Sequence, residues 1–285
     1  VPLHKKKSKT QNCFMDAKEK GFGGKKYLYL KQKHLFVEQV KTLLRRSGKG
    51  EACDKDSPHF VSHTYGRKNN KDFLNSKGIS FDDIHGMIVG SVVPAVNDAL
   101  YKLAESHLHC PPPLFVDYQT QTGIKLMVDN PAEVGADRII DALAAHKKYG
   151  GPLIIVDFGT ATTLDCVSAA GEYIGGAICP GVEISRDALF AHAAKLSSIA
   201  LTKPPKVIAT NSADYLRSGI LWGYGGQVDS LVRRMSEEWG QQPKVIATGG
   251  LAPLIADYSD AIDVVDIYLT LEGLMMIWDK LNADV

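Results

Sequence analysis

The stretch that decides the fold is "PLIIVDFGTATTLDCVSAAGEYIGGAICPG", residues 152–181. An apolar run over 153–156 leads to Asp157, a Gly-Thr-Ala-Thr-Thr segment and two further apolar runs separated by small residues. Short apolar runs bounded by turn residues are typical of buried strands. The stretch therefore predicts three short strands joined by two tight turns, and with them a sheet in the core.

The same stretch carries the strongest local signal of chemistry. Asp157 would lie at the carboxyl end of its strand, Gly159 permits a tight turn, and Thr160, Thr162 and Thr163 add hydroxyls. Exposed turn amides form a concavity that binds anions. Because a carboxylate repels phosphate, Asp157 would hold a cation beside it. An ordinary Gly-Thr hairpin with a capping aspartate fits the stretch equally well.

Outward from this stretch, apolar runs alternate with helical patterns from residue 78 onward, which predicts an α/β fold. Further strands are expected at 84–94, 111–119 and the start of 243–255, where a turn and a helix follow. Helices are expected at 97–107, 131–150, 184–196, 212–240 and 269–281. The helix at 131–150 has Pro131 in its first turn, and the one at 212–240 is expected to be loosened by Gly223, Gly225 and Gly226.

Two segments repeat one scheme. "MIVGSVVPAVNDAL" (87–100) and "VIATGGLAPLIADY" (245–258) each read as a buried strand, small residues, a proline and a helix. Two topologically similar halves would each contain one such element. Chance similarity between strand–turn–helix units explains the repeat equally well.

Composition favours a globular protein of one large domain or two smaller ones, since the chain has 285 residues. No apolar run approaches the ~20 residues of a membrane helix, and the first residues lack the apolar segment of a secretory signal. The five cysteines are scattered and odd in number. These features predict a protein of the reducing cytoplasm that has no membrane partner.

The N-terminal segment differs in character. Residues 1–80 hold 19 lysines and arginines against 7 acidic residues, whereas the rest of the chain is acidic in balance. Few aromatic residues accompany these charges, so a divergent, solvated segment is favoured over a nucleic-acid partner. "KKYLYL" (25–30) is compatible with a strand, and 35–46 with a helix. Cys53, His59 and His63 match no standard zinc framework.

Two further motifs suggest a site. In "GADR", the Asp137 carboxylate can take a proton from an alcohol while Arg138 orients a substrate anion, and Gly135 and Ala136 leave room beside them. A helix-surface ion pair is the simpler alternative. "TGG" (248–250) offers flat backbone to a base or ribose, or is a plain strand-to-helix turn.

Taken together, six segments resemble the type III pantothenate kinases in order and spacing. They are "SVVPAVNDAL", "TGIKLMVDNPAEVGADR", "GGPLIIVDFGTATTLD", "GEYIGGAICPGVEIS", "HAAKL" and "KVIATGGLAP". The resemblance runs from about Gly78 to Leu281. It implies a duplicated α/β fold of the actin/hexokinase/acetate-kinase superfamily. The actin-like (ribonuclease H-like) halves would be 1–150, with 1–77 atypical, and 151–285, each a mixed sheet flanked by helices, with the active site in the cleft between them.

The resemblance also implies a reaction, the ATP-dependent phosphorylation of the primary hydroxyl of pantothenate to 4′-phosphopantothenate, the first step of coenzyme A biosynthesis. Asp137 would be the general base, and pantothenate would contact Val128, Gly135, Ala136, Asp137, Arg138 and Ser212. ATP, with Mg²⁺, would contact Gly159, Thr160, Thr162, Thr248, Gly249 and Gly250. Asp157 would bind a monovalent cation (K⁺ or NH₄⁺), and the protein would be a homodimer.

Two departures from the family pattern bear on activity. Val128 stands where the family commonly has tyrosine. The family's first loop, Asp-x-Gly-Asn-Thr, would fall near residue 30, where the chain reads "GGKKYLYLKQKHLFVEQ" (23–39). A catalytically impaired homologue acting as a binding or transcriptional accessory protein is therefore the alternative hypothesis. Another kinase or hydrolase of the superfamily is a third.

Overall fold

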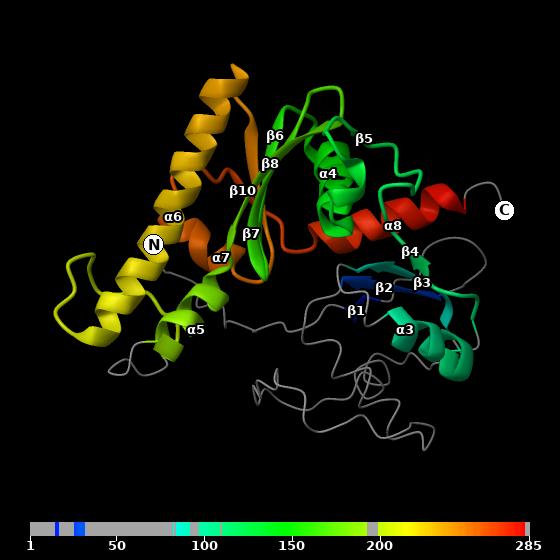
Figure 1. Cartoon of the computed structure of the whole chain (residues 1–285), viewed down its shortest axis with the longest axis horizontal. Helices are drawn as coiled ribbons and strands as arrows, with labels where there is room; N and C mark the ends of the chain where they lie inside the picture. The colour runs from blue at the N-terminus through cyan, green and yellow to red at the C-terminus, as the bar shows by residue number, and fades with distance from the viewer. Residues whose placement is uncertain are drawn as a thin grey trace, which may run out of the picture. The chain divides into compact units, whose positions relative to one another are not determined.

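A computed structural model describes residues 15–16, 26–31, 82, 84–91, 97–108, 110–192 and 199–282. The chain divides into two compact units, one of Met15–Val116 and one of Asp117–Val285 together with Val1–Phe14. Figure 1 labels their elements in chain order. The two are called the N-terminal unit and the C-terminal unit below.

The N-terminal unit contains a four-stranded sheet in the order β1-β2-β3-β4. Its strands are β1 (Met15–Asp16), β2 (Lys26–Lys31), β3 (Ile84–Gly90) and β4 (Leu114–Phe115). β1 is antiparallel to β2, whereas β2, β3 and β4 run parallel. Helix α3 (Asn97–Leu103) continues into a π-helical turn, η3 (Ala104–Leu108). The strand predicted in "KKYLYL" is confirmed, while the helix at 35–46 and Cys53, His59 and His63 lie outside the described residues.

The C-terminal unit contains a six-stranded sheet in the order β10-β9-β6-β7-β8-β5. Its strands are β5 (Lys125–Leu126), β6 (Leu153–Phe158), β7 (Ala161–Val167), β8 (Glu172–Pro180), β9 (Lys244–Thr248) and β10 (Val264–Val265). β6, β7 and β8 form an antiparallel meander, which confirms the three strands predicted within 152–181. β9 lies parallel to β6, and β10 parallel to β9.

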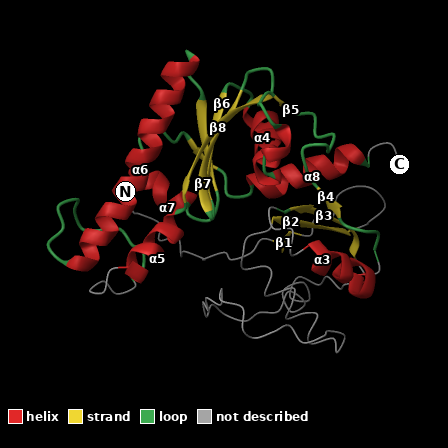
Figure 2. Ribbon diagram, viewed as in Figure 1, coloured by secondary structure: helices red, strands yellow, loops and turns green. Residues whose placement is uncertain are grey.

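Helices cover both faces of this sheet (Figure 2). α4 (Ala136–Tyr149) and α8 (Leu269–Leu281) pack on one face. α6 (Ser212–Trp239) and α7 (Ala252–Ile255), which continues into the 3₁₀ turn η5 (Ala256–Tyr258), pack on the other. α5 (Val182–His192) contacts β7 and α6. The two faces are called the α4 face and the α6 face below.

Burial on both faces explains why β6 is apolar throughout. Ile154, Val156 and Phe158 pack into the cluster on the α6 face, whereas Leu153 and Ile155 pack into the cluster on the α4 face. Side chains alternate between faces along a strand. Asp157 therefore belongs to the α4 face, at the carboxyl end of the strand.

Two helix predictions were wrong in detail. The helix expected from Pro131 begins at Ala136, because Pro131–Glu133 form a separate 3₁₀ turn and Gly135 caps α4 with extended backbone. α6 is one continuous helix of 28 residues and is not interrupted at Gly223, Gly225 and Gly226. Gly225 is needed for packing, since a Cβ there would lie 1.8 Å from the Tyr258 carbonyl oxygen.

The fold is thus mixed α/β, with sheets flanked by helices, as predicted. The parallel strands β6, β9 and β10 lie side by side in the C-terminal unit, and β2, β3 and β4 do so in the N-terminal unit. Within the described ranges, no helix combines the length and apolar character needed to cross a membrane.

Candidate active site

A row of polar residues crosses the α4 face at one edge of the sheet. Asp157 of β6 stands in register with Thr248 of β9 on one side and with Thr163 of β7 on the other. Directly opposed residues on neighbouring strands lie about 5 Å apart. Asp165, two residues beyond Thr163, continues on the same face. The row brings the opening stretch and the "TGG" motif together, as one site requires.

The "TGG" turn closes over the Asp157 carboxylate, which is only 7% exposed. Gly249 has φ +92°, a conformation that side chains with a Cβ rarely adopt. A Cβ at Gly249 would lie 2.4 Å from Asp157 Oδ1 and 2.6 Å from the Phe158 carbonyl oxygen. Glycine is therefore required where this turn meets the aspartate.

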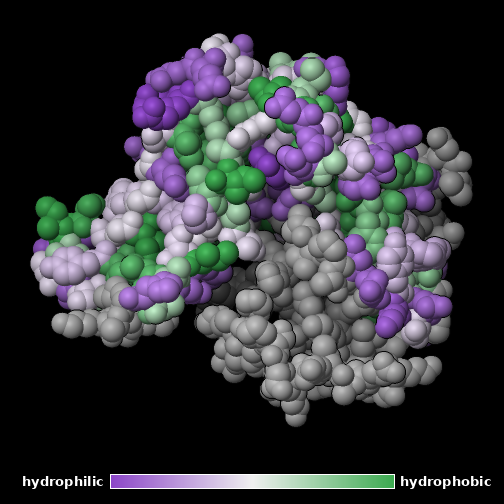
Figure 3. Space-filling view, viewed as in Figure 1, coloured by the Kyte–Doolittle hydropathy of each residue, from purple (hydrophilic) through white to green (hydrophobic). Residues whose placement is uncertain are grey.

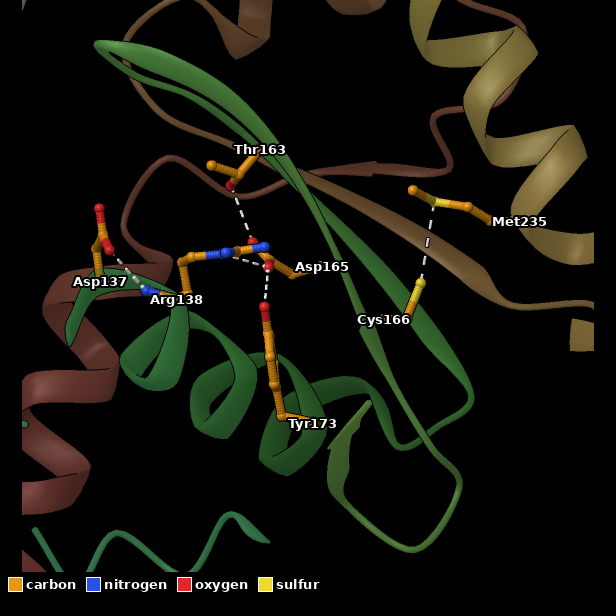
Figure 4. Close-up of polar contacts among 7 residues, drawn as sticks. All are labelled: Asp137, Arg138, Thr163, Asp165, Cys166, Tyr173 and Met235. Carbon is orange, nitrogen blue, oxygen red and sulfur yellow. Dashed lines mark hydrogen bonds and ion pairs between the residues drawn. The ribbon is translucent and has the colours of Figure 1, made fainter. Parts of the chain in front are cut away.

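The N-terminus of α4 supplies the "GADR" residues. Gly135 is the N-cap, so Asp137 stands in the first helical turn. Its Oδ1 accepts a hydrogen bond from the Arg138 backbone N–H at 2.9 Å, and its side chain is half-buried. The positive end of the helix dipole stabilises a carboxylate at this position. Figure 4 shows Asp137 directed away from the contacts made by the Arg138 side chain.

Arg138 spans from α4 to the sheet. Its Nε donates to Asp165 Oδ1 at 2.6 Å, and its guanidinium lies 5.6 Å from the centre of the Tyr173 ring. The Tyr173 hydroxyl donates to the same Asp165 oxygen at 2.8 Å, and Thr163 Oγ1 donates to Oδ2 at 2.9 Å (Figure 4). The Arg138 side chain is 14% exposed and that of Asp165 2%. This ion pair joins α4 to β7. The simpler alternative for "GADR", an ion pair exposed on the helix surface, therefore does not apply to Arg138.

Burial dominates the electrostatics of this cluster. It raises the pKa of Asp165, while the Arg138 charge and the Tyr173 and Thr163 hydroxyls act in the opposite direction. Burial and the neighbouring Asp165 charge raise the pKa of Tyr173 far above its usual value. Tyr173 therefore keeps its proton and remains a donor to Asp165.

Three predicted ATP contacts lie in the β6–β7 turn and at the start of β7, in different settings. Gly159 donates its backbone N–H to the Ala161 carbonyl at 2.9 Å, and Thr160 at the tip is exposed. Thr162 is fully buried on the α6 face, and its hydroxyl has no hydrogen-bond partner among the described residues. Gly250 follows Gly249 and is exposed.

The remaining predicted substrate contacts are dispersed. Ala136 is buried at the start of α4, and Val128 packs partly buried against the apolar cluster on the α4 face. Ser212 is exposed at the first residue of α6, the helix on the opposite face. No hydrogen bond or ion pair links Ser212 to the other predicted site residues within the described ranges. Nearby, Asn211 and Arg217 hold the pKa of Asp214 below its usual value.

Sequence reasoning missed Asp165 and Tyr173. The available signal was a charged residue inside the apolar strand "LDCV", since a buried carboxylate requires a partner. Among the described residues, no three His, Cys, Asp or Glu side chains are grouped to hold a metal ion.

Comparison with known proteins identifies the family. The family model described as "Type III pantothenate kinase" matches residues 56–234, well over half of the chain. The chain belongs to the type III pantothenate kinase family.

Among solved structures, the chain is similar to a conserved Campylobacter jejuni protein assigned to the Baf family of transcriptional activators. The identity is 20%, the match covers 70% of this chain and 85% of that one, and the TM-score is 0.47. A likeness of this extent says nothing about what the chain does.

Proposed function

We propose that the chain is an active pantothenate kinase that transfers the γ-phosphoryl group of ATP to the primary hydroxyl of pantothenate. Membership of the family supports a kinase of this type. The observation that carries the proposal is that Arg138, next to Asp137 at the start of α4, pairs with Asp165 of β7 on the sheet face to which Asp157 belongs. Such a transfer needs a general base, a positively charged side chain that binds the substrate anion, and a carboxylate beside the phosphates. Asp137, Arg138 and Asp157 are the proposed residues for these three roles.

Asp137 acts as the general base. It removes the proton of the pantothenate hydroxyl as that oxygen attacks the γ-phosphorus, and the bond from the γ-phosphorus to the β,γ-bridging oxygen breaks to release ADP. The proton resides on Asp137 until it passes to solvent. Phosphoryl transfer depends mainly on positioning and charge stabilisation, so a single well-placed carboxylate is sufficient protein chemistry.

Pantothenate is held by the residues around the start of α4. Gly135 and Ala136 provide backbone surface, and the Arg138 guanidinium recognises an anionic group. Val128 is a further contact carried over from the family, whereas Ser212, which the family also implies, begins α6 on the other face of the sheet and makes no hydrogen bond to these residues within the described ranges. Val128 supplies apolar surface where the family has a tyrosine, so we expect one polar contact fewer at that position.

ATP is held at the ends of β6 and β9, through Gly159 and the exposed Thr160 in the β6–β7 turn and through Thr248, Gly249 and Gly250 after β9. Thr162, the other contact carried over from the family, is fully buried on the α6 face and does not reach ATP in this structure. Asp157 fits a monovalent cation, K⁺ or NH₄⁺, because it is one buried carboxylate beside the Phe158 carbonyl oxygen under a glycine turn. Such a cation, together with the Mg²⁺ that accompanies ATP, neutralises phosphate charge. The protein holds the Asp157 carboxylate in place, and the glycine turn at 249 keeps side chains out of the space beside it.

We further propose that the chain is a duplicated actin-like fold with halves 1–150 and 151–285. The support is the parallel strand trio that recurs as β2-β3-β4 and β6-β9-β10. Residues 1–77 are the atypical part of the first half.

A homodimer in the cytoplasm is the proposed form. Ile178, Ile184 and Leu189 are 65%, 49% and 42% exposed, and hydrophobic residues gather at the surface over α5 and the start of α6 (Figure 3). Exposed apolar surface of this kind marks interaction sites. Light scattering of the purified protein should give twice the mass of one chain, and the mass of a single chain would contradict the dimer.

The alternative function is that of a catalytically impaired homologue acting as a binding or transcriptional accessory protein. The absence of Asp-x-Gly-Asn-Thr near residue 30 favours it, since "KYLYLK" (26–31) contains no acidic residue. The two hypotheses differ in one observable, which is turnover.

The test is ADP release by the full chain with ATP, Mg²⁺ and K⁺, with and without pantothenate. We expect pantothenate-dependent release, and we expect Asp137→Asn to lower kcat by roughly two to four orders of magnitude. Asp279→Asn, which alters an exposed carboxylate on α8, is the matched control and should retain activity. No pantothenate-dependent release by the parent protein would favour the impaired homologue.

A further inference from the structure

The guanidinium of Arg138 is engaged along one edge only. An arginine has five N–H donors in a planar fork. Nε donates to Asp165, and no other carboxylate or carbonyl of the described residues accepts a hydrogen bond from the two terminal nitrogens. The side chain is 14% exposed, and its terminal nitrogens are not among the buried unpaired side-chain atoms, so they remain accessible to a ligand. The free edge of the fork has the geometry that binds a carboxylate through two parallel hydrogen bonds.

Asp165 is in turn held rigidly. It is 1% exposed, and both of its oxygens are engaged, Oδ1 by Arg138 and Tyr173 and Oδ2 by Thr163. Thr163 and Asp165 belong to β7 and Tyr173 to β8, which are hydrogen-bonded neighbours in the sheet. Side chains anchored on strands hold a site more precisely than side chains on loops.

On the basis of the proposed function, we propose that Asp165 is a positioning residue for pantothenate recognition. By accepting from Nε, it turns the terminal nitrogens of Arg138 toward the pantothenate carboxylate. It also compensates the Arg138 charge while the site is empty, which limits the cost of a partly buried cation. Tyr173 and Thr163 act on Arg138 indirectly, because their hydroxyls hold the Asp165 carboxylate in place.

A matched pair of variants separates positioning from stability. Tyr173→Phe removes a hydroxyl that donates to a buried carboxylate near the start of α4. Tyr149→Phe removes an equivalent hydroxyl, which donates to the buried Asp266 at 2.7 Å from the other end of the same helix. Both variants lose one hydrogen bond of the same type. Only Tyr173→Phe loosens Arg138.

We expect Tyr173→Phe to raise the KM for pantothenate by about fivefold, the scale of one modest hydrogen bond. The KM for ATP should stay within about twofold, and Tyr149→Phe should leave both KM values at the parent level. Asp165→Asn, where it folds, should raise the pantothenate KM further. Equal pantothenate KM values for the two tyrosine variants would overturn the proposal, as would a rise in the ATP KM instead.

A second measurement does not depend on turnover. The Nε–H signal of Arg138, assigned by its loss in Arg138→Lys, should show slow hydrogen exchange in the parent and faster exchange in Tyr173→Phe. Fast exchange in the parent would overturn the positioning of Arg138 whatever the activity. Slow exchange in a parent that does not phosphorylate pantothenate would refute the proposed function and the pantothenate assignment, while the Arg138–Asp165 pairing would stand.

Discussion

Gly249→Ala is the perturbation for which the structure gives the clearest magnitude. The new Cβ would lie 2.4 Å from Asp157 Oδ1 and 2.6 Å from the Phe158 carbonyl oxygen. At φ +92° the backbone is also strained for any residue with a Cβ. Backbone strain of this kind costs about 1–3 kcal/mol, and overpacking typically costs a further 1–3 kcal/mol. The free energy of unfolding should therefore fall by about 2–6 kcal/mol, a large part of the roughly 5–15 kcal/mol of a typical domain.

Gly226 of α6 is the control, because it lies outside the proposed site and a Cβ there meets nothing within 4 Å. Urea unfolding of the two variants gives the difference in stability directly. In kinetics, the displaced Asp157 carboxylate should raise the KM for ATP and the K⁺ concentration needed for half-maximal rate in Gly249→Ala only. Equal stability and equal kinetics in the two alanine variants would refute the reasoning about this turn.

Two further predictions concern the core of the C-terminal unit. Burial, with the charges of Asp165 and Glu238, raises the pKa of the Cys166 thiol from 9.0 to about 11. Its thiolate fraction near pH 8 is then about 100-fold lower than that of an ordinary cysteine. Because the unfolded chain loses this proton first, stability should fall as pH rises from 9 toward 11, and alkylation followed by mass spectrometry should modify Cys166 only on unfolding. Leu164→Ala, at a fully buried position on the α6 face, should lower the unfolding free energy by about 2–5 kcal/mol. Met127→Ala, at a 48% exposed position, should change it by less than about 0.5 kcal/mol, and similar losses for both would contradict the packing described.

The meander β6–β8 was predictable because local chemistry determines it. Apolar runs of strand length end at Asp157 and Val167, and the turns that follow contain Gly159 and Gly171. The start of α4 was not predictable from Pro131, although proline favours a first turn. Asn130 accepts from the Ala132 N–H and caps a separate 3₁₀ turn, and Val134 is extended, so the helix begins only after Gly135.

The Arg138–Asp165 pair lay beyond sequence reasoning for a different reason. The two residues are 27 positions apart, and their contact depends on where α4 crosses the sheet. Alternation along β7 places Asp165 on the same face as Asp157. It does not say which helix covers that face. Short strands that pair only at a sheet edge, such as β5 and β10, were missed because two residues carry no periodic pattern.

The central claim is that this chain phosphorylates pantothenate although residues 26–31 contain no acidic residue. The most direct test incubates the 285-residue chain with ATP, Mg²⁺, K⁺ and pantothenate and identifies the product by ³¹P NMR and mass spectrometry. The account predicts one new phosphate monoester on the primary hydroxyl of pantothenate, formed in equal amount with ADP and lost in Asp137→Asn. Unchanged pantothenate, with ATP intact or merely hydrolysed to ADP and phosphate, would contradict it.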